Sequence, residues 1–157
     1  MKVRFFLAVL LLFSVAAVNA QDSGEQETIS DDEIKRYAVM MDSIDQMRSE
    51  LLAEISEMVK TNENISVARY NDLYKLVDNE AKLAELEATP QEIAAIKEVQ
   101  ARKDSGASEI QTAFKEIVKE YVGIPTYNKV GKAIKSDNAV KSKYEAMLEE
   151  LKADNGG

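Results

Sequence analysis

The sequence predicts an all-α protein, a helical bundle of about five helices in which two long amphipathic helices are each followed by shorter ones. Two observations predict this class. Glycine and proline are sparse, with six and two residues, and aromatic residues make up only 6% of the chain, which favours helices over a sheet. In addition, apolar residues recur at alternating spacings of three and four, the period of one helical face.

The first long helix is expected to begin after Ser30, because Ser30 and Glu33 have the spacing of a capping box. It should end between Lys60 and Asn64, where polar residues favour a turn. A helix of about 30 residues is roughly 45 Å long. Its apolar stripe, interrupted at Arg48, comprises Ile34, Tyr37, Met41, Ile44, Leu51, Ile55 and Met58.

A second helix is predicted from about Ser66 to Leu86, and its inner face would include Tyr70, Leu73, Val77 and either Leu83 or Ala84. The third helix opens with a second capping box, formed by Thr89 and Glu92, and proline follows the cap at its preferred first position. Because the apolar phase survives across Gly106, we expect one long helix with a weak point at this glycine. Its stripe comprises Ile93, Ile96, Ala107, Ile110, Phe114, Ile117 and Tyr121.

Two shorter helices are predicted to complete the bundle. Gly123 is a natural C-terminal cap, and Pro125 opens the fourth helix. Ser136 or Asp137 is expected to cap the fifth. The inward residues of these two helices would be Tyr127, Val130 and Ile134, followed by Val140, Tyr144, Met147 and Leu151.

The first 20 residues have the three parts of a secretory signal peptide in order: two basic residues, an apolar run, and small residues before Gln21. The apolar run of about 14 residues is too short for a membrane anchor. We therefore expect an exported bacterial protein, periplasmic or secreted, with a signal peptide (1–20), a flexible lead-in (21–29) and a single helical domain (30–154). The chain has no cysteine, so we expect neither a lipoprotein-type lipid anchor nor disulfides, and no transmembrane segment after cleavage.

The net negative charge of the chain argues against some classes of binding partner. The chain has 20 Lys and Arg against 28 Asp and Glu, and residues 1–20 contain two basic and no acidic residues, so cleavage leaves 18 against 28 and a net charge of −10. Nucleic acid and anionic membranes are bound by clustered Lys and Arg. The sequence therefore predicts no nucleic-acid partner.

The two halves of the domain, 30–88 and 89–154, resemble each other. Each begins with a capped long helix and later contains a Tyr-Asn pair, Tyr70-Asn71 in the first half and Tyr127-Asn128 in the second. One interpretation is an internal duplication that folds as two related helical hairpins. The alternative is chance similarity between amphipathic helices.

Two segments resemble a bacterial exported family known as domain of unknown function 4168. The first is ISDDEIKRYA, which comes after the signal peptide. The second is the closing segment GIPTYNKVGKAIKSDNAVKSKYEAMLEEL, in which the family's motif positions are taken by Tyr127, Asn128, Ala133, Asp137 and Lys141 or Lys143. The resemblance implies a small exported helical protein with no established activity. Asn138-Ala139-Val140 departs from the family's usual Pro-Glu-Leu.

We find no catalytic, cofactor-binding or metal-binding signature. With no His and no Cys, the usual zinc, haem and copper sites are excluded, and nucleophilic catalysis lacks its common base. The motif residues of interest are Tyr70, Asn71, Tyr127, Asn128 and Asp137. The Tyr-Asn pairs fit either a recognition point presented twice or a structural role, with each tyrosine packed at the base of a hairpin and each asparagine capping or turning the chain.

The sequence supports two functional hypotheses. The first is a non-enzymatic envelope protein that acts by protein–protein interaction, either chaperone-like or self-assembling, because long stripes with polar interruptions leave room for partner helices. Met40, Met41, Met47 and Met58 fit either ordinary core packing or an adaptable surface for clients. The second is a small envelope enzyme or small-ligand carrier. An apolar groove along the first and third helices would favour the former, and a closed pocket with two or more buried carboxylates the latter.

Overall fold

A computed structural model of the chain describes residues 28–155. The predicted signal peptide (1–20) and residues 21–27 of the predicted lead-in lie outside the described residues. The helices are α1 (Asp31–Lys60), α2 (Val67–Leu73), the 3-10 helix η1 (Tyr74–Leu76), α3 (Glu80–Glu85), α4 (Pro90–Ile117), the π-helical turn η2 (Val118–Val122), α5 (Ile124–Ser136) and α6 (Asn138–Asn155). The predicted all-α class is confirmed.

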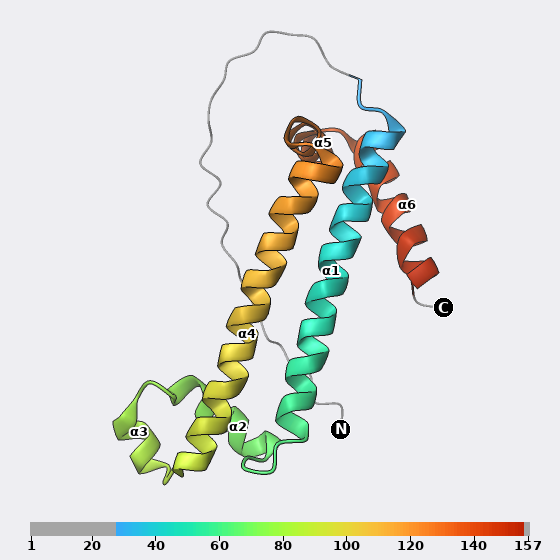
Figure 1. The fold of residues 1–157 in the computed structure, drawn as a ribbon. Coiled ribbons are helices and arrows are strands. Elements are labelled where there is room, and N and C mark those ends of the chain that lie inside the picture. Colours follow the sequence, from blue (N-terminus) through green and yellow to red (C-terminus); the bar gives the residue numbers. More distant parts are fainter. Residues whose placement is uncertain (1–27, 156–157) are drawn as a thin grey trace.

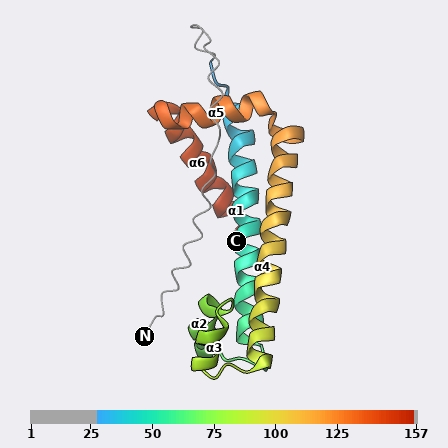
Figure 2. The same cartoon turned by 90° about the vertical axis from the view of Figure 1, so that its left-hand side faces the viewer.

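The frame of the molecule is an antiparallel hairpin of the two long helices, α1 and α4 (Figure 1). The short helices α2 and α3 lie at the end where α1 stops and α4 starts. At the opposite end α5 crosses the hairpin, and α6 returns alongside α1. In Figure 2, α2, α3 and α6 all lie to the left of α1, and α4 forms the right-hand flank. The short helices therefore leave one side of the hairpin uncovered within the described residues.

The predicted limits of α1 are confirmed. The Ser30 side chain accepts a hydrogen bond from the Glu33 backbone N–H, and the Glu33 carboxylate accepts one from the Ser30 backbone N–H at 2.8 Å. Three acidic residues in the first turn favour the same start. The buried residues of α1 are Ile34, Ala38, Met40, Ile44 and Val59. Burial is complete near both ends of the helix and partial along its middle, where only α4 faces it.

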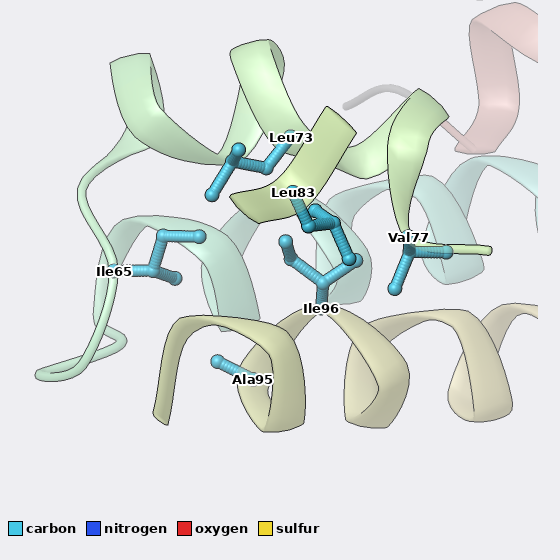
Figure 3. Close-up of a cluster of buried hydrophobic side chains, with 6 residues drawn as sticks. All are labelled: Ile65, Leu73, Val77, Leu83, Ala95 and Ile96. Atoms are coloured by element: carbon cyan, nitrogen blue, oxygen red, sulfur yellow. The ribbon is translucent and has the colours of Figure 1, made fainter. Parts of the chain in front are cut away.

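The prediction of one continuous second helix from Ser66 to Leu86 is wrong. The chain tightens into η1 after Leu73, turns, and starts again as α3 at Glu80. The Asn79 side chain accepts a hydrogen bond from the Lys82 backbone N–H at 3.1 Å and so caps a new helix. This break lets both short pieces fold over the start of α4. Figure 3 shows the resulting cluster of Ile65, Leu73, Val77, Leu83, Ala95 and Ile96. Leu83 points inward, whereas Ala84 is exposed.

Helix α4 is continuous through Gly106, as predicted, but this glycine is a packing point and not a weak point. Gly106 is buried, and a Cβ atom added there would lie 2.7 Å from Leu51 Cδ2. The absence of a side chain lets α4 approach α1 closely. Ala107, which the stripe placed inside, is exposed because its neighbour Gly106 faces α1 instead.

The inward placement of Tyr121 is also wrong, since 47% of this residue is exposed. The π-helical turn η2 inserts an extra residue into the turn and rotates the residues after it. Val118 and Val122 therefore become the buried pair of this segment. The backbone then reverses at Gly123, whose φ of 85° lies in the region that favours glycine.

The predicted fourth and fifth helices are confirmed as α5 and α6. Asp137 lies between them, and its Oδ1 accepts hydrogen bonds from the backbone N–H groups of Ala139 at 2.8 Å and Val140 at 3.3 Å. Asp137, rather than Ser136, therefore caps α6. Val130 is fully buried, and Tyr127 is half-buried.

Candidate functional site

The two Tyr-Asn pairs lie at opposite ends of the hairpin and do not form one site. Tyr70 and Tyr127 are both half-buried and stacked: Tyr70 on Tyr74 with 5.6 Å between ring centroids, and Tyr127 on Tyr37 with 5.5 Å. These contacts agree with the packing role expected for the tyrosines. Asn71 and Asn128 are exposed and lie inside α2 and α5. The expectation that the asparagines cap or turn the chain is therefore wrong.

A positively charged side chain binds the first turn of each long helix. The Arg69 guanidinium bonds to Glu92 at 2.8 Å and also donates to the Leu86 carbonyl, next to the cap of α4. The Lys129 ammonium bonds to Glu33 at 3.1 Å and donates to the Thr28 carbonyl, next to the cap of α1. The pKa of Glu92 is lowered, mainly by its bond to Arg69. The pKa of Glu33 is also lowered, mainly by the hydrogen bond from the Ser30 backbone and further by Lys129.

These two ion pairs are equivalent in position. In each, a cation next to the Tyr-Asn pair of one half binds the capping-box glutamate of the other half. Arg69 of the first half binds Glu92 of the second, and Lys129 of the second half binds Glu33 of the first. The equivalence accords with the duplication inferred from sequence, which stays a prediction. Each ion pair joins a short helix to a long one, and none of its residues lines either of the depressions described below. We therefore assign both ion pairs a structural role.

An aromatic cluster joins α1, α4, α5 and α6. The Tyr37 ring stacks on Tyr127 and meets Tyr144 edge-on at 5.6 Å, while Phe114 meets Tyr127 edge-on at 5.6 Å. Burial raises the pKa of Tyr37 to about 12, and the neighbouring Tyr127 and Tyr144 add to this increase. The neutral phenol is thus the form that the folded state stabilises.

Stability should consequently fall at alkaline pH through Tyr37. Its folded-state pKa of about 12 lies above the ordinary value of 10.0, so its contribution is complete below pH 10 and is lost as the pH rises toward 12. Urea unfolding across this window should show a smaller loss for Tyr37→Phe than for wild type. Parallel losses in the two proteins would assign the alkaline instability to another group.

A concave feature lies in the middle of the hairpin, between its two long helices. There the Arg102 guanidinium on α4 forms two hydrogen bonds to the Glu54 carboxylate on α1, each of 2.7 Å. The Arg102 bonds lower the pKa of Glu54. Beside this ion pair, a hollow of about 150 Å³ lies between the two helices. Its lining comprises Met47, Glu50, Leu51, Glu54, Arg102, Gly106, Glu109 and Ile110.

A second, shallower depression continues from this hollow along α4. It shares Glu109 with the hollow and adds Ser105, Ser108, Thr112, Ala113 and Glu116. We call the lining residues of both depressions together the open face. The open face is the side of the hairpin that α2, α3 and α6 do not cover. It carries four glutamates and one arginine.

The sequence analysis did not identify Arg102 or Glu54 as site residues. They lie 48 residues apart, and their pairing depends on the register between two long helices. The available signal was Gly106, because a glycine inside a strong helical pattern often marks a close approach. Met40 is fully buried in the core, which agrees with the packing role expected for the methionines, whereas Met47 lines the hollow.

The open face is exposed to solvent. Among the described residues, no polar or charged residue is buried, and no group of three or more His, Cys, Asp or Glu is placed to hold a metal ion. Catalytic carboxylates generally depend on burial to shift their pKa. The hollow between α1 and α4 is open to solvent and combines the apolar side chains of Met47, Leu51 and Ile110 with three glutamates and Arg102. The depression beside it is lined by α4 residues alone.

Comparison with known proteins identifies the family. Across the described residues, no helix combines the length and apolar character needed to cross a membrane. No curated protein and no solved structure matches the chain. Residues 30–144, which include all the helices up to the middle of α6, match the family described as "Domain of unknown function (DUF4168)". The chain belongs to this family.

Proposed function

We propose that this chain is an exported, non-enzymatic bacterial protein that acts in the cell envelope by binding other proteins through its open face. The groove between α1 and α4 is the observation that carries the proposal. Export rests on the signal-peptide pattern of residues 1–20. Periplasmic or secreted location follows from export.

The open face is a long surface of the hairpin that the described short helices leave free. Apolar side chains along one helical side are normally covered, and here Met47, Leu51 and Ile110 are only partly buried. A long two-helix surface with an apolar floor accepts a third helix from a partner. The groove along the first and third predicted helices is the feature expected of an interaction protein.

The alternative functions have less support. A small envelope enzyme or small-ligand carrier requires a closed pocket with convergent buried polar groups, and the depressions of the open face are exposed hollows. Self-assembly through the open face would bring glutamates against glutamates, because four of its five charged residues are acidic. Like charges across an interface oppose association.

Photo-crosslinking tests the proposal. A benzoylphenylalanine replaces Ser108, which is on the open face, or Ser142, which is exposed on α6, in cells that export the protein. We expect irradiation to give discrete crosslinked protein products from position 108 and not from position 142. Absence of products from position 108, or the same products from both positions, would contradict the proposal. A single product of twice the chain's mass would identify self-assembly instead.

A further inference from the structure

We propose that the open face binds a basic amphipathic helix of a partner protein. This inference rests on the proposed function and specifies the chemistry of the partner. It is based on three properties of the groove: the shape of its floor, the charge of its rim and its length.

The hollow can accept a protruding apolar side chain. The Leu51 side chain packs on Gly106 where α4 approaches α1, and Met47, Leu51 and Ile110 line the hollow beside this contact. Met47 is a flexible and polarisable side chain that adapts to differently shaped partners. An apolar residue of an incoming helix would bury its surface in this hollow, while residues three and four positions away would lie along Ala113.

The glutamates at the edges of the open face favour a positively charged partner. The Arg102 charge is already matched by its two bonds to Glu54. Glu50 lies on the α1 rim and Glu116 on the α4 rim, both exposed, and neither forms an ion pair within the described residues. Lysine or arginine residues flanking an apolar stripe would pair with them from either side. The net charge of −10 that the chain has without residues 1–20 attracts such a partner from a distance.

The length of the open face sets the length of the ligand. Its α4 residues run from Arg102 to Glu116, and those beyond Ile110 belong to the depression that α4 alone lines. At 1.5 Å per residue this stretch of α4 spans about 21 Å. A partner helix of about 14 residues matches this distance. The bound helix would lie beside α4 on the side of the hairpin that α2, α3 and α6 leave uncovered.

A tryptophan-labelled synthetic peptide provides the test. The probe is a helix of about 14 residues in which leucines form one face and lysines the other, with one leucine replaced by tryptophan. The protein contains no tryptophan, so all tryptophan fluorescence reports on the peptide. We expect saturable binding to the protein, and roughly fivefold weaker binding to the double variant Glu50→Gln and Glu116→Gln.

The control is a variant with the same change of charge elsewhere. Glu149→Gln and Glu150→Gln are exposed on α6 and should leave the affinity nearly unchanged. Equal weakening in both double variants would show non-specific attraction and overturn the inference. Binding of a peptide with glutamate in place of lysine would overturn it as well. If no peptide binds while position 108 still crosslinks to a protein, the inference fails and the proposed function stands.

Discussion

Ile96→Ala is expected to lower the free energy of unfolding by about 3 kcal/mol, because it opens a cavity in a small core that has little capacity to relax. Ile96 is fully buried on α4 and projects among Ile65, Leu73 and Leu83 (Figure 3). This cluster holds the short helices α2 and α3 against the hairpin. Their amides should therefore lose protection from hydrogen exchange more than those of α6.

Leu86→Ala is the matched control for Ile96→Ala. Leu86 lies in the same region of the chain but is 40% exposed, so its truncation should cost well under 1 kcal/mol. Urea unfolding followed by circular dichroism measures both changes. An Ile96→Ala protein no less stable than Leu86→Ala would show that the cluster does not attach α2 and α3 to the hairpin.

Gly106→Ala is expected to have opposite effects in two backgrounds. In the wild-type protein the new Cβ would lie 2.7 Å from Leu51 Cδ2 and 2.9 Å from Arg102 Nη1, so both side chains must move. Their displacement outweighs the gain in helix propensity, and we expect a net destabilisation of about 1 kcal/mol. In a Leu51→Ala background the main obstacle is absent, and the same substitution should stabilise the helix by about 1 kcal/mol.

A double-mutant cycle measures this coupling. The four proteins, wild type, the two single variants and the double variant, should give an interaction energy of about 2 kcal/mol between positions 51 and 106. The magnitude reports how tightly α1 and α4 approach each other at the hollow of the open face. An interaction energy near zero would mean that the two helices do not meet at Gly106, and it would remove the basis for the groove.

Much of the helical content was predictable from sequence because its causes are local. The capping boxes of Ser30 with Glu33 and of Thr89 with Glu92 span four residues each, and both are present. The continuity of α4 through Gly106 followed from the phase of its apolar residues. The assignment to the family also rests on the sequence, which matches over residues 30–144.

The errors arose where a distant part of the chain decides the local structure. The second predicted helix breaks before Asn79, and its two pieces place Leu73 and Leu83 in one cluster with Ala95 and Ile96 of α4, a burial of apolar surface that favours the break. Tyr121 is exposed because the π-helical turn changes the phase that a regular repeat assumes. Neither the break at Asn79 nor the exposure of Tyr121 can be predicted from the spacing of apolar residues within one helix.

The all-α class, the capped starts of both long helices and the family follow from the amino-acid sequence alone. The candidate site depends on the tertiary structure. The pairing of Arg102 with Glu54 joins residues 48 positions apart, and the hollow beside it is lined by residues of both long helices, among them Leu51 and Gly106, which pack against each other across the hairpin. Helix propensity and capping act within a few residues. The register between α1 and α4, and hence the open face, depends on packing between segments that are remote in the chain.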